Sequence, residues 1–129
     1  MPGDKRQIYI VDDDESVCRA LKTLLISHNF EVTTFNSSKS FFDGVPTDDF
    51  GCVILDIHMP GPDGWETQKK IFDSGSKRPV IFVSAVKEDV SARALKVGAV
   101  GFLQKPFDGQ TLVDLINVAL AKKERKIKK

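Results

Sequence analysis

Acidic residues, a serine and a lysine each follow a separate apolar segment of this sequence. Asp12 and Asp13 come directly after the apolar run at residues 8–11, and Asp56 follows the run at residues 52–55. Ser84 follows the run at residues 79–83, and Lys105 follows a fourth run at residues 101–104. If these runs are parallel strands of one sheet, their carboxyl ends share the edge at which ligands bind in open α/β sheets. The spacing therefore predicts one polar site built from distant parts of the chain.

Asp56 is the predicted nucleophile of this site, because a carboxylate can attack phosphorus and form an acyl phosphate. The attacking carboxylate and the phosphoryl oxygens are both negative, so the reaction needs positive charge close by. Asp12 and Asp13 are expected to hold Mg²⁺ or Mn²⁺ beside Asp56, since these ions prefer oxygen ligands. The backbone carbonyl of His58, in the following loop, is predicted to complete the metal's coordination.

Lys105 and Ser84 are expected to act on the phosphoryl group from the other side. The lysine would supply a fixed positive charge, and the serine hydroxyl would donate a hydrogen bond to a phosphoryl oxygen. Taken singly, each candidate has an ordinary structural explanation: an aspartate that caps a helix, a solvated lysine, or a serine in a turn. All of them at strand ends in one chain instead favour a site for a divalent metal and a phosphoryl group.

The composition indicates a single globular domain. The chain has 129 residues, of which 41% are hydrophobic and 29% are charged. Nineteen lysine and arginine residues stand against 18 acidic residues, so no overall charge favours binding of nucleic acid. Residues 122–129 are strongly basic, and a solvated tail or linker is favoured there over a nucleic-acid contact. We therefore predict a domain at residues 1–121, followed by a basic tail or linker at residues 122–129.

The cysteines and the hydropathy pattern point to a reducing compartment and to no membrane association. Cys18 and Cys52 have neither metal-binding nor redox spacing, so both are expected to be reduced and buried. No apolar stretch reaches the roughly 18 residues of a membrane-spanning helix. The N-terminal residues lack the apolar core of a signal peptide. The expected location is the cytoplasm.

Short apolar runs alternate with helical periodicity, which is typical of an α/β fold with a parallel sheet. Strands are expected at residues 7–11, 31–35, 52–55, 80–83 and 100–103. Helices are expected after residue 14, after Ser37 or Ser38, at residues 65–74, at residues 90–97, and after Asp108. The buried face of the first helix is predicted to contain Val17, Ala20, Leu21, Leu24 and Leu25. That of the last helix is predicted to contain Leu112, Leu115, Ile116, Ala119 and Leu120.

Taken together, these motifs resemble the receiver domains of bacterial response regulators, the phosphoacceptor part of two-component signalling. The likeness covers about residues 7–120 and rests on VDDD at residues 11–14, LDIHMPGPDG at 55–64, VSA at 83–85 and GAVGFLQKPF at 98–107. It implies a doubly wound, flavodoxin-like (βα)₅ fold with strand order 2-1-3-4-5. In detail, the resemblance runs towards receivers attached to helix-turn-helix transcription regulators.

The resemblance also implies roles for individual residues. Asp56 would accept a phosphoryl group from a histidine kinase, with Mg²⁺ held by the three aspartates named above. Ser84 and Phe102 would form a switch that alters the face made by the fourth helix, fifth strand and fifth helix. The peptide bond between Lys105 and Pro106 would be cis, which X–Pro bonds allow. Such a domain catalyses only its own phosphorylation and dephosphorylation, so it is not expected to be an enzyme that acts on a metabolite.

The expected partners are the kinase and an effector domain or downstream protein, with no membrane and no direct contact of this segment with nucleic acid. A phosphorylation-dependent homodimer is left open, as are the kinase, the output, the lifetime of the phosphoryl group and the completeness of the chain.

Three other classes share parts of this pattern. A phosphatase of the haloacid dehalogenase type also uses an aspartate nucleophile, Mg²⁺ and a lysine. It needs a second aspartate where this chain has His58, and it needs room for a cap domain. A flavodoxin-like nucleotide binder would need a phosphate cradle in place of the aspartates after the first strand. A degenerate receiver that serves only as an interaction module is disfavoured by the presence of every phosphorylation residue.

Overall fold

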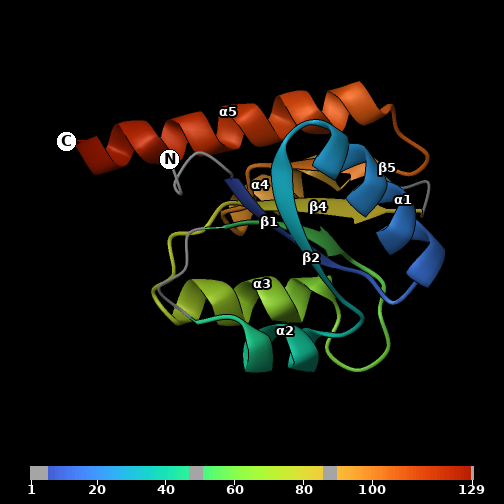
Figure 1. The fold of residues 1–129 in the computed structure, drawn as a ribbon. Helices are drawn as coiled ribbons and strands as arrows, with labels where there is room; N and C mark the ends of the chain where they lie inside the picture. Colours follow the sequence, from blue (N-terminus) through green and yellow to red (C-terminus); the bar gives the residue numbers. More distant parts are fainter. Residues whose placement is uncertain (1–5, 47–50, 86–89, 129) are drawn as a thin grey trace.

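The protein has a five-stranded parallel sheet with strand order β2-β1-β3-β4-β5 (Figure 1). The computed structural model describes residues 6–46, 51–85 and 90–128, with side chains as far as residue 121. The strands are β1 (Arg6–Val11), β2 (Phe30–Phe35), β3 (Cys52–Asp56), β4 (Val80–Ser84) and β5 (Gly101–Gln104). Each pair of neighbouring strands is parallel. The predicted fold class and strand order are therefore confirmed.

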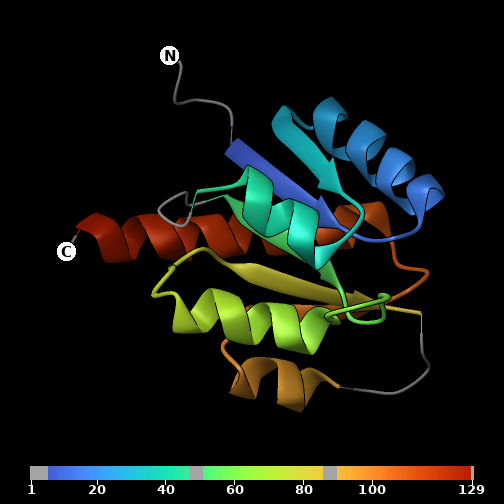
Figure 2. The same ribbon diagram turned by 90° about the horizontal axis from the view of Figure 1, so that it is seen from below.

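Helices cover both faces of the sheet. They are α1 (Glu15–Ser27), α2 (Ser38–Gly44), α3 (Gly64–Asp73), α4 (Ser91–Lys96) and α5 (Gly109–Lys128). α1 and α5 lie on one face, and α2 and α3 lie on the other (Figure 1). α3 lies between α2 and α4 when the molecule is seen from below (Figure 2). The predicted helices at 65–74 and 90–97 are present, with ends that differ by one residue.

Alternate side chains of the inner strands enter two separate cores, as expected for a sheet that is buried on both faces. One core, towards α1 and α5, contains Ile8, Ile10, Cys52, Ile54, Ile81 and Val83. The other, towards α2, α3 and α4, contains Tyr9, Val11, Val53, Leu55, Val80 and Phe82. This alternation leaves the strand ends as the only parts of β1, β3 and β4 at which polar side chains gather among the described residues.

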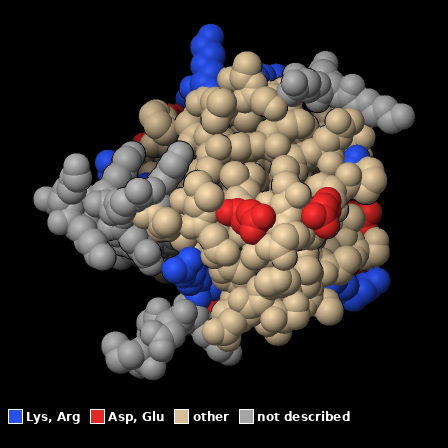
Figure 3. Space-filling view, turned by 90° about the horizontal axis from the view of Figure 1, so that it is seen from above, with Lys and Arg blue, Asp and Glu red and all other residues tan. Residues whose placement is uncertain are grey.

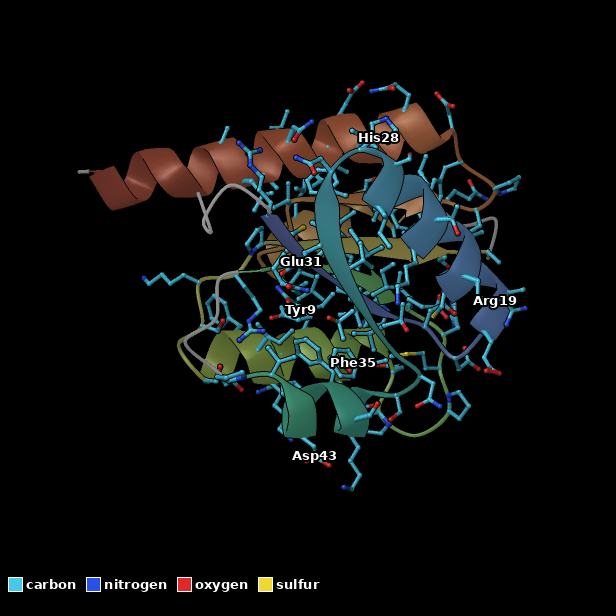
Figure 4. The ribbon with its side chains drawn as sticks, in the orientation of Figure 1. Tyr9, Arg19, His28, Glu31, Phe35 and Asp43 are labelled. Carbon is cyan, nitrogen blue, oxygen red and sulfur yellow. The ribbon has the colours of Figure 1, made fainter. Side chains whose placement is uncertain are left out.

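The second core includes an aromatic group that attaches α2 to the sheet. Tyr9 of β1 and Phe35 of β2 lie on the side that faces α2 (Figure 4). Phe41 of α2 meets both rings, with centroid distances of 5.9 Å to Tyr9 and 5.6 Å to Phe35. The near-perpendicular arrangements suit the charge distribution of aromatic rings. A helix of seven residues is too short to be stable alone, so the packing of Phe41 against the sheet stabilises α2.

The first helix faces the core with a stripe slightly different from the predicted one. Its buried residues are Cys18, Leu21 and Leu25, spaced by three and four residues. Ala20 is exposed, so its predicted place on the buried face is wrong. Cys18, two residues earlier and on the other side of the helix, lies on the buried face instead. The two cysteines are buried and unpaired, and burial raises the pKa of Cys52 to about 12 and that of Cys18 to about 11.

The last helix forms much of the surface seen from above. It begins directly after Asp108, and Leu112, Ile116, Ala119 and Leu120 are buried, as predicted, with Leu115 partly buried. Its backbone continues as helix to residue 128, beyond the predicted domain boundary at 121. Seen from above, most of the described surface is neither acidic nor basic (Figure 3). Within the described residues, no helix is both long enough and apolar enough to cross a bilayer.

Gly64 is the point of closest approach between α3 and the end of β3. A Cβ atom at this position would lie 2.6 Å from the carbonyl oxygen of Asp56 and 2.7 Å from the Cα of Ile57. The backbone N–H of Gly64 donates to the carbonyl of Ile57 at 2.8 Å. Asp63 and Glu66 cap the helix reciprocally, each side chain accepting from the other's backbone N–H at 2.9 Å. The start of α3 is therefore held tightly against the strand that ends in Asp56.

Replacing Gly64 with alanine is expected to destabilise the fold by about 2 kcal/mol, because the new methyl group meets backbone that cannot move aside. Urea denaturation measures this loss. Gly44→Ala, at the end of α2, is the matched control: its φ is not positive, and its added methyl meets only the ring of Phe35, at 3.0 Å, which can shift. A loss at Gly64 no larger than that at Gly44 would contradict the steric explanation.

Candidate functional site

Strand register places the predicted site residues at one edge of the sheet. β1 and β3 pair Val11 with Leu55, so the residues that follow, Asp12 and Asp56, are neighbours. β3 and β4 pair Asp56 with Val83, which puts Ser84 one position further along. The carboxyl ends of these strands, which are far apart in the sequence, therefore form one site, as the sequence predicts.

Three carboxylates form the centre of this site. Asp12, Asp13 and Asp56 each offer an oxygen atom, and these atoms all lie within 4.8 Å of one another. Asp12 is 1% exposed and Asp56 is 5% exposed, whereas Asp13 lies at the surface. The cluster therefore combines two buried acids with one acid that is accessible to solvent.

Lys105 lies within reach of both buried acids. Its Nζ atom is 2.9 Å from Oδ2 of Asp12 and 3.7 Å from Oδ1 of Asp56. The backbone N–H of Lys105 donates to the carbonyl of Ser84 at 2.7 Å, which attaches the lysine to the end of β4. The peptide bond between Lys105 and Pro106 is cis. The lysine therefore joins the site through its backbone as well as through its charge.

The second oxygen of Asp12 is occupied by the start of α1. The backbone N–H of Asp14 donates to Oδ1 of Asp12 at 2.9 Å. Asp14 itself caps α1, accepting from the backbone N–H groups of Ser16 at 2.9 Å and Val17 at 3.3 Å. The hydroxyl and N–H of Ser16, together with the N–H of Val17, lower the pKa of Asp14. Asp14 thus belongs to the helix cap, and Asp12 has both oxygens engaged.

The site contains three carboxylates and one lysine, and this excess of acidic groups affects the pKa of Asp56. Burial and the neighbouring charge of Asp12 raise the pKa of Asp56 from 3.8 to about 6. Lys105 and a hydrogen bond from the backbone N–H of His58 act in the opposite direction, but more weakly. Burial disfavours the charge of Lys105 itself, yet the hydrogen bond and charge of Asp12 leave the lysine's pKa raised. The site therefore holds more negative charge than one lysine neutralises.

This donor set fits a small, hard divalent cation. Mg²⁺ binds carboxylate and carbonyl oxygens and keeps several waters, so a few protein oxygens on one side are sufficient. Burial and the neighbouring charge of Asp12 raise the pKa of Asp56, and a divalent ion bound beside both carboxylates would offset that charge. Asp12, Asp13 and Asp56 are the residues that would hold it.

The remaining predicted residues lie where their strands place them. Ser84 is buried at the end of β4, and Phe102 of β5 is partly buried and packs against the second core. The side chain of His58 is exposed, and its backbone N–H faces the Asp56 carboxylate. The carbonyl of His58 as a metal ligand and the pairing of Ser84 with Phe102 stay predictions.

Sequence reasoning missed two contributions to the site. It expected Lys105 to act on the phosphoryl group from the other side, and it did not foresee that the Nζ atom of Lys105 donates a hydrogen bond to Asp12. It also did not recognise the role of Gly64, which brings α3 against the carbonyl of Asp56. The sequence signal for this role was a glycine directly after Asp63. Asp63 is the capping residue of a helix that follows the candidate nucleophile.

Comparison with known proteins identifies the class to which this geometry belongs. Residues 8–117 match the family model of the response regulator receiver domain. The chain is 41% identical over 120 residues to the transcriptional regulatory protein TdiR of Thauera aromatica, covering 92% of this chain and 53% of TdiR. It is 37% identical over 121 residues to the transcriptional regulatory protein FixJ of Bradyrhizobium diazoefficiens, covering 93% of this chain and 59% of FixJ.

A solved structure agrees with these sequence relatives. The response regulator StyR superposes with a TM-score of 0.86 at 36% identity, covering 96% of this chain and 64% of that one. The chain thus spans little more than half the length of the curated relatives named above.

The first prediction from the site concerns the stability of the metal-free protein. Because the folded-state pKa of Asp56 is about 6 against an ordinary 3.8, the folded chain binds more protons than the unfolded chain between these values. Its stability therefore falls as the pH rises from about 4 to about 6. Asp56→Asn removes this loss and is expected to raise the free energy of unfolding by about 1–2 kcal/mol at neutral pH, allowing for screening by water.

Urea denaturation in the presence of a chelator, near pH 4.5 and near pH 7.5, measures the difference. Glu31→Gln, an exposed carboxylate-to-amide change on β2, is the matched control. A gain for Asp56→Asn that is the same at both pH values would show that ionisation is not its cause.

The second prediction concerns the metal. About 10 mM Mg²⁺ is expected to raise the Tm by about 3–6 °C, because a ligand that binds only the folded state stabilises it. Asp13→Asn should lose most of this shift while keeping the fold, since Asp13 is exposed. Glu15→Gln, a nearby exposed acid outside the cluster, should keep the shift. Equal shifts in both variants, or in sodium chloride of matched ionic strength, would exclude the assigned metal site.

Proposed function

The chain belongs to the family of response regulator receiver domains, and we propose that it takes up a phosphoryl group on Asp56 and thereby changes its affinity for a partner. The observation that carries the proposal is the position of the Asp56 carboxylate. It is buried at a strand end, beside Asp12, with the Lys105 ammonium 3.7 Å away. A nucleophile, a cation and oxygen ligands for a metal thus meet at one place.

The proposed donor is a phosphohistidine of a histidine kinase. An oxygen of Asp56 attacks the phosphorus, the bond from phosphorus to the donor's ring nitrogen breaks, and its electron pair leaves with the imidazole. Lys105 offsets charge on the phosphoryl oxygens, and the Ser84 hydroxyl donates to one of them. Asp12, Asp13 and Asp56 would hold a Mg²⁺ ion, which would supply further positive charge to offset that of the phosphoryl group.

Ionisation of Asp56 is a condition for this reaction. With a pKa of about 6, the carboxyl group is mostly charged at neutral pH and can act as a nucleophile. The same burial that raises its pKa also removes competing water, which strengthens the contribution of Lys105. The site is therefore reactive at neutral pH without a separate base.

The proposed consequence of phosphorylation is a change at the face formed by α4, β5 and α5. Ser84 ends β4 and Phe102 lies in β5, so a movement of the serine towards the phosphoryl group would alter the packing of the ring. An effector domain or downstream partner would respond, and a homodimer through this face is part of the proposal. Because TdiR and FixJ are named transcriptional regulatory proteins, we propose control of transcription as the output.

The proposed unit is a receiver domain at residues 1–121 with a basic tail at residues 122–129, acting in the cytoplasm. In this role the protein turns over its own phosphoryl group and no external metabolite. A phosphatase of the haloacid dehalogenase type is not favoured, because the receiver family model covers residues 8–117. A degenerate receiver is opposed by the proximity of Asp12, Asp56 and Lys105.

Incubation with acetyl phosphate and Mg²⁺ is expected to add one phosphoryl group, seen by intact-mass spectrometry. Asp56→Asn should lose the adduct, and omission of Mg²⁺ should reduce it at least about 10-fold, because the metal offsets charge in the transition state. Glu31→Gln should be labelled like the native chain. An adduct that persists in Asp56→Asn would move the nucleophile elsewhere. A native chain that stays unlabelled and also binds no fluoroberyllate with Mg²⁺ would identify a degenerate receiver.

A further inference from the structure

We propose that the groove between α3 and α4 binds an acidic amphipathic helix of a protein partner. The groove has a volume of about 480 Å³ and lies between two helices that run side by side (Figure 2). It exists in the unmodified chain, so the proposal does not rest on the phosphoacceptor function.

The walls of the groove are apolar and aromatic. Trp65 and Phe72 line it from α3, and Val97 lines it from the end of α4. Phe72 is 67% exposed, the largest exposure among the described large hydrophobic residues. Contiguous apolar surface of this kind on a folded chain usually marks a place where another molecule packs.

A second hollow extends the apolar surface beyond Phe72. It has a volume of about 450 Å³ and is lined by Ile71, Pro79 and Val100, and it shares Phe72 and Gly98 with the first. The ring of Phe72 therefore stands between two hollows. A helix that places successive apolar side chains on one face, three or four residues apart, could fill both.

Most of the charged residues that line the groove are basic. Its lining includes Lys69, Arg93 and Lys96, with Glu66 as the acidic member among the described residues. Lys69 is bridged to Asp73 at 2.7 Å, and Glu66 is engaged in the cap of α3. The guanidinium of Arg93 lies 3.9 Å from the centre of the Trp65 ring, which holds its charge at the rim. An occupant with acidic residues beside its apolar face is the complementary one.

Two of the chain's own exposed apolar residues, Ile26 and Leu95, do not have this complementary charge. Ile26 shares α1 with Arg19 and Lys22, and Leu95 is adjacent to Lys96 on α4. Basic residues beside these side chains would be repelled by the rim of the groove. A second copy of the chain that docked through Ile26 or Leu95 would therefore fit less well than an acidic partner.

A buried hydrogen bond joins the two helices that form the groove. The Nε2 of Gln68, which is 3% exposed, donates to the carbonyl of Val97 at 3.0 Å and ties α3 to the end of α4. Within the described residues its Oε1 has no hydrogen-bond partner. The groove is therefore preformed, which reduces the ordering that binding would require.

Trp65 is the single tryptophan of the chain and lines the groove, so its fluorescence reports an occupant directly. The probes are two synthetic helical peptides without tryptophan, with leucine at identical anchor positions and either glutamate or lysine beside them. The glutamate peptide is expected to change the fluorescence saturably and to bind at least about 10-fold more tightly than the lysine peptide at low salt.

Variants locate the binding site. Phe72→Ala is expected to weaken binding of the glutamate peptide at least about 5-fold, and combined Arg93→Gln and Lys96→Gln should remove most of the preference over the lysine peptide. Leu95→Ala, an exposed residue of α4 outside the groove lining, is the control and should bind like the native chain. Circular dichroism and the Tm confirm that each variant is folded.

Three results would overturn the proposal. The lysine peptide could bind as tightly as the glutamate peptide, or folded Phe72→Ala could bind like the native chain. Alternatively, sedimentation could show a dimer of the native chain that Phe72→Ala dissociates, in which case a second copy is the occupant.

Discussion

Two buried carboxylates within reach of one lysine form the interaction on which the site is built. Asp12 and Asp56 are almost completely buried, and Lys105 lies 2.9 Å from one and 3.7 Å from the other. Burying like charges together is unfavourable unless a counter-charge or a proton accompanies them. The raised pKa of Asp56 results from this burial and from the neighbouring charge of Asp12. This unfavourable electrostatic energy favours binding of a cation. A bound cation would in turn favour binding of a phosphoryl group.

The surrounding fold restricts how these charges can relax. Asp12 cannot turn away, since its second oxygen accepts the backbone N–H of Asp14 at the start of α1. The backbone of Asp56 is held in place, since Gly64 brings the first turn of α3 against its carbonyl. Lys105 is attached to the end of β4 by its own backbone N–H. Neighbouring elements thus restrict how far the charged groups of the site can move apart.

The site and the proposed docking groove share structural elements although they lie apart. α3 begins at Gly64, directly against the strand that ends in Asp56, and α4 follows the strand that ends in Ser84. The contact of Gln68 with Val97 joins these two helices. A displacement of either strand end would therefore act on the groove through helices that are packed and bonded together, which is the physical requirement for coupling between two sites.

The sequence alone determined the element order, the strand-end positions of Asp12, Asp56, Ser84 and Lys105, and hence the class of chemistry. These follow from local periodicity and from the rule that parallel strands align their carboxyl ends. The start of the last helix was predicted correctly, directly after Asp108, since caps are local in sequence.

Tertiary structure decided what depends on distance and burial. Only the folded chain shows that Lys105 bonds Asp12 more closely than Asp56, that Asp14 caps a helix while Asp13 stays with the acidic cluster, and that Cys18 rather than Ala20 faces the core. The groove beside Phe72 likewise arises from two helices about twenty residues apart in the chain. Burial, pKa and the shape of a groove are set by atoms from several elements at once, so no local pattern of residue types contains them.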